Sequence, residues 1–149
     1  MRTEEDLYVE TGYKILYEDE FFLGVDKPAP LPVHPVGRFR EKNLLSLLVR
    51  DLGPSPEGLR IVNRLDSETS GIVLVAKSGK MAGQLGILFE KRQVAKEYHA
   101  VVFGLPKAEK GTISISLGLN AESGHNIRTA DPLGEKAQTD YQVVSSADG

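Results

Sequence analysis

The feature that most constrains the fold is residues 63–71, which carry an arginine and an aspartate and run directly into the apolar residues 72–76. In an extended chain, residues two apart project from the same face, so we expect Arg64 and Asp66 to point together, and their neighbours to point the other way. The threonine, serine and glycine that end the segment can turn the chain through side-chain-to-backbone hydrogen bonds and glycine's freedom in φ. This pattern predicts two charged side chains at the mouth of a buried strand, where loops commonly carry function.

Length and composition suit one soluble globular domain. The chain has 149 residues, of which 40% are hydrophobic, and that is enough to bury a core. Without cysteine it can form neither disulfides nor thiolate metal sites, and its histidines (His34, His99 and His125) show no metal-ligand spacing. No apolar run approaches the roughly 20 residues that a membrane span needs, and the N-terminus lacks the apolar core of a signal peptide. We therefore expect a cytoplasmic protein with no metal site and no membrane contact.

The charge of the chain is slightly negative but unevenly distributed. A formal net charge of −3 argues mildly against tight, nonspecific binding to nucleic acid, which usually requires a basic surface. Basic residues are nevertheless concentrated in residues 38–64 and again in residues 91–96. A basic cleft on an acidic body therefore remains open as an interpretation, although solvated surface charges are the commoner explanation for any single one of these residues.

The apolar pattern predicts an α+β domain with a mixed, mostly antiparallel sheet and short flanking helices. Stretches typical of strands occupy residues 13–17, 21–25, 72–76, 94–103, 112–117 and 137–144. Because residues 72–76 are wholly apolar, we expect that strand to be buried on both faces. The proline-rich residues 27–32 can be neither helix interior nor central strand, so they should form an extended loop.

Two short helices are expected between these strands. Asn43 is placed to cap one helix, whose apolar side consists of Leu44, Leu47 and Leu48. Residues 80–89 have apolar side chains at helical spacing, although each of the two glycines among them weakens a helix by about 1 kcal/mol relative to alanine.

Asp66 is the best candidate for chemistry. An aspartate carboxyl is ionised at neutral pH, which suits a nucleophile or an electrostatic stabiliser better than a general acid. From the spacing alone, an exposed Arg64–Asp66 ion pair worth about 0–1 kcal/mol is the more frequent role for such residues. The turn and the apolar strand that follow raise the catalytic interpretation only modestly.

Tyr98 is the second candidate. It shares one face of the expected strand at 94–103 with Lys96, an arrangement that offers a ring and a cation to a ligand. A base stacked on an aromatic ring contributes about 1–3 kcal/mol. The ordinary alternative is a core tyrosine whose hydroxyl is hydrogen-bonded.

Residues 64–77, from the Arg-Leu-Asp stretch through the apolar strand to Lys77, resemble the signature of the RluA-type RNA pseudouridine synthases. Three further stretches agree with that family in order and spacing, namely residues 17–35, 96–104 and 136–143. The resemblance implies a pseudouridine synthase catalytic fold that acts on RNA, either tRNA or rRNA, and converts uridine to pseudouridine without a cofactor.

The resemblance also implies roles for individual residues. Asp66 matches the essential aspartate of the family, and Arg64 matches an arginine that pairs with it and helps to hold the flipped nucleotide. Tyr98 matches the tyrosine that packs against the target base. Lys96 lies in the same matching stretch, and we expect it to bind the substrate as well. Extruding a uridine from a helix costs a few kcal/mol, which an aromatic platform and a cation can offset.

The chain departs from the family pattern at two places. Asn63 stands where the family usually has histidine, and we expect it to face away from Asp66 and to affect packing or loop hydrogen bonds. Nothing after Val144 resembles the arginine-containing motif with which the family's core continues. The expectation is therefore that residues 1–149 are a catalytic domain lacking its C-terminal part, without an S4-type domain.

An incomplete domain leaves two alternatives open. One is an RNA-binding remnant of a pseudouridine synthase that is catalytically silent, and a weaker one is a small-molecule hydrolase that uses Asp66 on an unrelated fold. If the domain is incomplete, we also expect an uncovered strand edge or apolar patch near the C-terminus, since such edges invite pairing with another chain.

Overall fold

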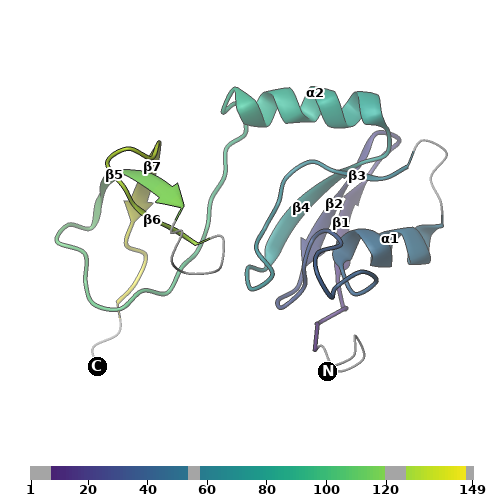
Figure 1. Cartoon of the computed structure of the whole chain (residues 1–149), viewed down its shortest axis with the longest axis horizontal. Coiled ribbons are helices and arrows are strands. Elements are labelled where there is room, and N and C mark those ends of the chain that lie inside the picture. The colour runs from purple at the N-terminus through teal and green to yellow at the C-terminus, as the bar shows by residue number, and fades with distance from the viewer. Residues whose placement is uncertain (1–7, 54–57, 120–126, 147–149) are drawn as a thin grey trace. The chain divides into compact units, whose positions relative to one another are not determined.

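The computed structural model describes residues 8–53, 58–119 and 127–146, and the chain divides into two compact units, residues 1–97 and 98–149. Each unit contains its own antiparallel sheet, and both helices belong to the first unit (Figure 1). The expected α+β class with antiparallel strands and two short helices is confirmed, although the strands form two sheets and not one.

The first unit is built on a four-stranded sheet with the order β1-β2-β4-β3. Its strands are β1 (Lys14–Glu18), β2 (Phe22–Lys27), β3 (Arg60–Ile61) and β4 (Gly71–Ala76). Every neighbouring pair is antiparallel, and β2 and β4 pair along their whole lengths, from Phe22 opposite Ala76 to Lys27 opposite Gly71. The predicted first, second and third strands are therefore confirmed, whereas β3 was not predicted because it has only two residues.

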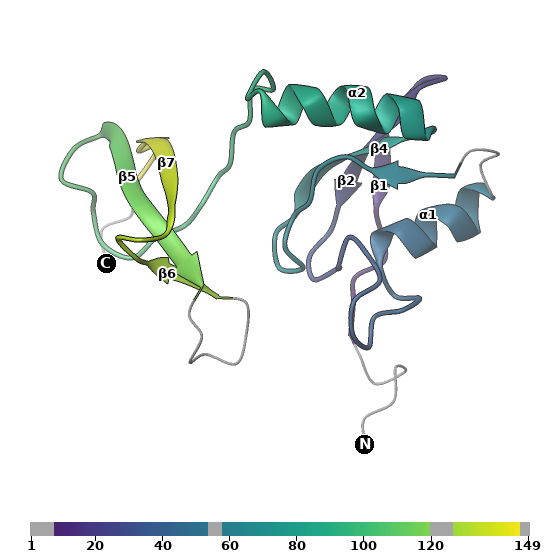
Figure 2. The same ribbon diagram turned by 45° about the horizontal axis from the view of Figure 1, so that its top comes forward.

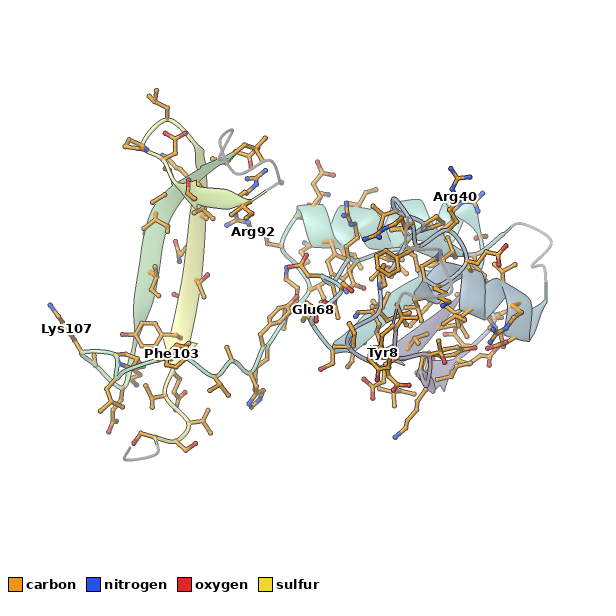
Figure 3. The ribbon with its side chains drawn as sticks, turned by 60° about the horizontal axis from the view of Figure 1, so that its bottom comes forward. Tyr8, Arg40, Glu68, Arg92, Phe103 and Lys107 are labelled. Atoms are coloured by element: carbon orange, nitrogen blue, oxygen red, sulfur yellow. The ribbon has the colours of Figure 1, made fainter. Side chains whose placement is uncertain are left out.

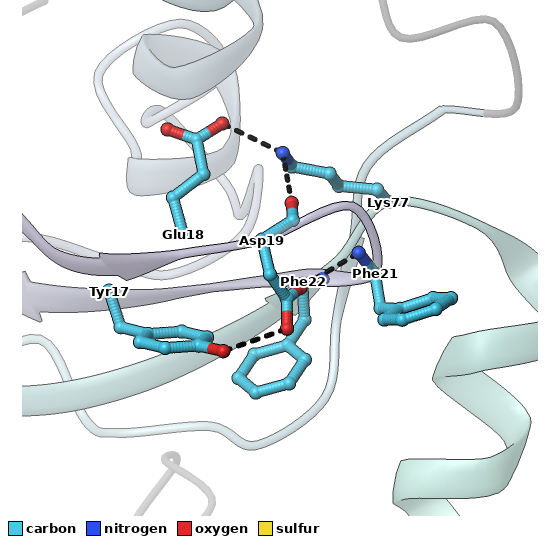
Figure 4. A network of polar contacts seen from close by, with 6 residues as sticks. All are labelled: Tyr17, Glu18, Asp19, Phe21, Phe22 and Lys77. Atoms are coloured by element: carbon cyan, nitrogen blue, oxygen red, sulfur yellow. Dashed lines mark hydrogen bonds and ion pairs between the residues drawn. The ribbon is translucent and has the colours of Figure 1, made fainter.

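The turn between β1 and β2 is stabilised by the carboxylate of Asp19 (Figure 4). Its Oδ1 accepts hydrogen bonds from the backbone N–H groups of Phe21 and Phe22, both at 2.8 Å, and its Oδ2 accepts one from the Tyr17 hydroxyl at 2.9 Å. The backbone N–H groups hold the pKa of Asp19 below its ordinary value. Lys77, which follows β4, donates from Nζ to the Asp19 carbonyl at 2.6 Å, so this turn is joined to the central strand.

The core of the first unit lies between the sheet and α1 (Leu44–Leu52) (Figure 2). Its members come from β2, β4, α1 and the connecting loops: Leu23, Val25, Leu31, Val33, Leu44, Leu47, Leu48, Leu59, Val73 and Val75. Asn43 caps α1 as predicted, because its Oδ1 accepts a hydrogen bond from the Ser46 N–H at 3.0 Å. The prediction that β4 is buried on both faces fails at Ile72, which is 59% exposed, whereas Ala76 on the same face is buried.

The second helix, α2 (Gly79–Glu90), contacts β3 and β4 and confirms the helix expected at residues 80–89. Ser78 caps it, accepting a hydrogen bond from the Met81 N–H at 3.2 Å. None of its residues is buried, so α2 contributes less to the core than α1 does.

The second unit is a three-stranded sheet with the order β6-β5-β7. Its strands are β5 (Lys110–Leu119), β6 (Arg128–Ala130) and β7 (Glu135–Gln142), which confirms the two strands predicted in this region. None of the described residues of this unit is buried. Ile113 and Ile115 lie on one face of β5 and are about half exposed, at 50% and 47%, so the predicted uncovered apolar surface near the C-terminus is present.

The strand predicted at residues 94–103 is not formed. None of the strand pairings among the described residues includes this stretch, and its side chains at Val101 and Phe103 are fully exposed (Figure 3 labels Phe103). An alternating pattern becomes a strand only where a neighbouring backbone offers hydrogen-bond partners, and periodicity alone cannot reveal whether one is present.

Candidate functional site

Asp66 lies in the connection between β3 and β4, on a segment whose exposure alternates residue by residue. Arg64 and Asp66 are exposed, while Asn63 and Leu65 are half-buried and Leu65 packs against the core. The prediction that Arg64 and Asp66 share one face, with their neighbours turned inward, is therefore confirmed. The alternation arises because the inward positions are held by packing and by hydrogen bonds to β4.

Arg64 and Asp66 do not form an ion pair with each other, as judged from the ion pairs of the described residues. The exposed surface ion pair, which the spacing alone favoured, is therefore not the role of these side chains in this structure. Both charged groups are open to solvent, and a ligand can reach them without first breaking a mutual contact.

A buried lysine lies beneath the Asp66 turn. Lys27, at the end of β2, is 0% exposed and donates from Nζ to three backbone carbonyl groups, those of Pro28 at 2.9 Å, Leu31 at 2.8 Å and Ser67 at 3.1 Å. The N–H of Leu31 donates to the same Ser67 carbonyl at 3.0 Å. The proline-rich loop after β2 is thus joined to the residue that follows Asp66.

The carboxylates of the turn act on the charge of Lys27. Burial lowers the pKa of the Lys27 ammonium group, while the negative charges of Glu68 and Asp66 act in the opposite direction. Glu68 is exposed at the surface (Figure 3). One buried cation therefore lies close to two exposed carboxylates of the turn.

Lys27 was not among the predicted site residues, although the sequence carries a signal for it. Leu23, Val25 and Lys27 alternate along β2, so Lys27 occupies the third inward-facing position of a buried strand. A lysine in that register must find several acceptors, because an unpaired buried charge is very costly. The proline that follows leaves the end of the strand irregular, with carbonyl groups free to accept.

Asn63 faces β4 and not Asp66, as expected for the position that departs from the family's histidine. Its Nδ2 donates to the Ile72 carbonyl at 3.1 Å, and its Oδ1 accepts a hydrogen bond from the Leu74 N–H at 2.7 Å. Both polar atoms of the carboxamide are thus bonded to the central strand, immediately before the chain turns toward Asp66.

A compact basic loop precedes α1. Gly37, with φ of 52°, permits a tight turn that is closed by an isolated bridge between Val36 and Phe39. The buried side chain of Asn43 donates from Nδ2 to the carbonyl groups of Phe39 at 3.0 Å and Arg40 at 2.9 Å. The side chains of Arg38 and Arg40 are exposed on this loop, and Figure 3 shows that of Arg40.

His34 connects the basic loop electrostatically to the Asp66 turn. Burial lowers the pKa of His34, and the positive charge of Arg64 lowers it further. Arg64 is therefore close enough to His34 to act on its charge. Arg38, Arg40 and Arg64 are all exposed basic residues of the first unit.

The two remaining predicted residues lie in the sequence on either side of the boundary between the units. Lys96 is in the first unit, where its Nζ lies 5.9 Å from the centroid of the Phe89 ring, within range of a cation–π contact. Tyr98 is in the second unit and 61% exposed, so it is not a core tyrosine. The shared strand face expected for these two residues is not formed, and an approach of Tyr98 to Asp66 stays a prediction.

Neither a metal-binding cluster nor a membrane-spanning helix is found in the parts of the chain that the structure describes. These residues contain no group of three or more His, Cys, Asp or Glu side chains arranged to hold a metal ion. Likewise, no helix among them has the length and apolar character needed to cross a bilayer. His125 lies outside the described residues.

The family model described as RNA pseudouridylate synthase matches residues 22–149, which include β2 and everything that follows it. Among curated relatives, the mitochondrial tRNA pseudouridine(32) synthase of Saccharomyces cerevisiae is 39% identical over 97 residues, which cover 64% of this chain and 20% of the yeast protein. Ribosomal large subunit pseudouridine synthase D of Vibrio cholerae is 34% identical, over 87% of this chain and 40% of the relative.

A solved structure has a fold similar to that of this chain. The human RNA pseudouridylate synthase domain containing 4 superposes with a TM-score of 0.70 and 31% identity, covering 89% of this chain and 54% of the human one. The chain thus spans about half the length of that structure and less than half of the two curated relatives.

Proposed function

The chain belongs to the RNA pseudouridylate synthase family and is of its RluA type, and on that premise we propose that the intact protein isomerises specific uridines to pseudouridine in structured RNA. The relatives named for tRNA and for large-subunit ribosomal RNA make these two RNA classes the substrates to test. Asp66 is the reacting carboxylate in this proposal.

The observation that carries the proposal is the position of Asp66. Its side chain is exposed, yet the residues on either side are anchored, Asn63 to β4 and Ser67 to Lys27. A nucleophile must be ionised and accessible, and it must also be held in place, because a misplacement of about 1 Å can cost a factor of about 100 in rate. Asp66 is exposed, has no ion-pair partner among the described residues and lies on an anchored turn, which meets the requirements of access and position.

The reaction needs no cofactor because its atoms balance within the nucleotide. The bond between N1 of uracil and C1′ of ribose breaks, the base turns, and a new bond forms between C5 and C1′. The C5 proton is released and N1 gains a proton, while Asp66 is regenerated. The target uridine must first be flipped out of its stack, at a cost of a few kcal/mol.

The other predicted residues bind the RNA in this scheme. Arg64 lies on the same exposed face as Asp66 and holds the flipped nucleotide through a phosphate or base oxygen. Tyr98 supplies a ring for the target base, and Lys96 adds a cation beside it. The exposed Arg38 and Arg40 extend the basic surface toward flanking phosphates.

The test is tritium release from transcribed tRNA and ribosomal RNA labelled at C5 of uridine. We expect Asp66→Asn to lose activity by a factor on the order of 1000 or more, because removing a nucleophile removes the covalent or ionic step that it starts. Glu68→Gln is the matched control: it removes an exposed carboxylate from the same turn and should retain activity. Full activity of Asp66→Asn would exclude Asp66 from the reaction.

A second candidate function is RNA binding without catalysis. It is favoured by the second unit, in which no described residue is buried, and by the chain covering only 40% of the Vibrio relative. Turnover and a binding titration, measured with the 149-residue chain on the same RNA, separate the two candidates. Binding at low salt without tritium release supports this second function, and release supports the first.

A further inference from the structure

We propose that Asn63 is a positioning residue whose side-chain amide takes the place of a peptide unit in the β3–β4 ladder and so sets the direction in which the Asp66 turn leaves the sheet. This inference deepens the proposed function and rests on it for its biological meaning. The structural part of the inference concerns hydrogen bonds alone, and it can be tested without any catalysis.

The pairing register of β3 and β4 shows which backbone groups should be hydrogen-bonded beyond the end of β3. β3 and β4 are antiparallel, with Ile61 opposite Val75, so one further step places Val62 opposite Leu74. The N–H of Val62 donates to the Leu74 carbonyl at 2.8 Å, as this register requires. A hydrogen-bonded antiparallel pair normally exchanges two bonds, with the second running from the Leu74 N–H to the Val62 carbonyl. That N–H donates to Asn63 Oδ1 at 2.7 Å.

The Asn63 side chain also replaces a backbone group at the next hydrogen-bonded pair of the two strands. Continuing the register would place Arg64 opposite Ile72, whose carbonyl would accept a hydrogen bond from the Arg64 N–H. The Ile72 carbonyl accepts from Asn63 Nδ2 at 3.1 Å. A carboxamide carries one carbonyl oxygen and N–H donors in the arrangement of a peptide group, so one side chain can serve both rungs.

The consequence is that the Leu74 N–H and the Ile72 carbonyl of β4 keep hydrogen-bond partners while the main chain is released. Because the ladder does not need the Arg64 backbone, the chain can turn away from β4 at that residue and present Asp66 two residues later. On its far side the turn is held by the Ser67 carbonyl, which accepts from buried Lys27 at 3.1 Å. Only residues 64–66 lie between the two anchors, which leaves Asp66 little freedom.

This role makes a specific chemical demand on position 63. The side chain must offer one donor and one acceptor at short reach. The carboxamide of the half-buried Asn63 offers both. Alanine offers neither group, and aspartate would set a carboxylate oxygen against the Ile72 carbonyl. A neutral imidazole offers both functions, but a protonated one has two donors and no acceptor for the Leu74 N–H.

The experiment is amide hydrogen exchange in the 149-residue chain, read by NMR at three reporters. The amide of Leu74 reports the bond to Asn63, while those of Thr69 and Leu31 report the turn itself, because they donate to the carbonyl groups of Asp66 and Ser67. We expect Asn63→Ala to accelerate exchange about tenfold at all three amides. The Ala82 amide in α2, which donates to the Ser78 carbonyl, should change by less than about twofold.

Ile72→Ala is the matched control. It alters an exposed side chain on the same strand but keeps the backbone carbonyl that Asn63 uses, so exchange at Thr69 and Leu31 should stay at the wild-type rate. If Asn63→Ala accelerated exchange at the Leu74 amide alone, the positioning role would be overturned, since the turn would not depend on the bond. Equal acceleration at Ala82 would also overturn it, because the effect would be general destabilisation of the unit.

A second variant tests, through pH, whether the Leu74 amide needs an acceptor at position 63. Asn63→His should protect the Leu74 amide above the pKa of the new imidazole and lose that protection below it, relative to wild type at the same pH. Protection that does not change with pH contradicts the requirement for an acceptor. Where the chain turns over RNA, Asn63→Ala should lower kcat more than it raises KM. Failure of Asp66→Asn to lose activity would refute the proposed function and leave the exchange results unaffected.

Discussion

The two units of this chain contain similar sheets and differ in what covers them. In the first unit, α1 packs on β2 and β4 and buries a continuous apolar core, and Lys27 and Asn43 are buried there with hydrogen-bond partners. In the second unit, β5 presents Ile113 and Ile115 on one face, and none of the described residues is buried. A sheet with one apolar face needs a second layer to gain the free energy of burial, so only the first unit has the packing that makes a precise site.

The largest expected difference between the units is in the cost of removing an apolar side chain. Leu48→Ala, in the core of the first unit, should lower the free energy of unfolding by about 2–5 kcal/mol, because it leaves a cavity. Ile115→Ala, on the open face of β5, should cost less than about 1 kcal/mol. Urea unfolding followed by amide signals from each unit measures both values. Equal costs would show that the face carrying Ile115 is covered in solution.

The next largest effect concerns the buried cation of the first unit. Lys27→Met should lower the free energy of unfolding by about 1–3 kcal/mol, because the Leu31 carbonyl loses its donor and the Ser67 carbonyl keeps only the Leu31 N–H. It should also accelerate hydrogen exchange at the Leu31 amide. Lys14→Met, on exposed β1, is the control and should stay within about 0.5 kcal/mol. A neutral result for Lys27→Met would mean that the site does not depend on this interior contact.

A smaller effect is expected on RNA binding, which basic residues of the two units should influence to different extents. If the basic surface is in the first unit, Arg38→Ala should weaken binding and reduce the salt dependence of log K by about one phosphate contact. Lys107→Ala removes an exposed positive charge from the second unit and should change that dependence much less (Figure 3). Binding titrations at several salt concentrations measure both slopes. A larger change for Lys107→Ala would move the RNA surface to the second unit.

The smallest effect is the pH dependence contributed by His34. Burial and the charge of Arg64 lower the pKa of this imidazole in the folded state, so the unfolded chain binds the proton more readily. The contribution of His34 to stability is therefore complete above the unfolded pKa of about 6.5 and is lost as the pH falls through the lowered folded pKa. His34→Gln should lose less stability than wild type over that acidic range, as measured by thermal unfolding. An unchanged pH profile would contradict a partly buried His34 near Arg64.

Local patterns predicted most of the first unit correctly. The alternation at residues 63–66 predicted the shared exposed face of Arg64 and Asp66, and Asn43 was recognised as the cap of α1. These predictions succeeded because the interactions concerned join residues near in sequence. The strand expected at residues 94–103 failed for the opposite reason, since its pattern was sufficient but no described strand pairs with it.

The sequence by itself determined the chemistry available to this protein: an aspartate and an arginine on one face of a turn, an apolar strand behind them, and four stretches that mark the family. The tertiary structure decided how the turn is held. Lys27 reaches Ser67, forty positions along the chain, and Asn63 reaches across to Ile72 and Leu74. Such contacts follow from the register of the paired strands and from the satisfaction of buried polar groups, which depend on how the chain folds back on itself.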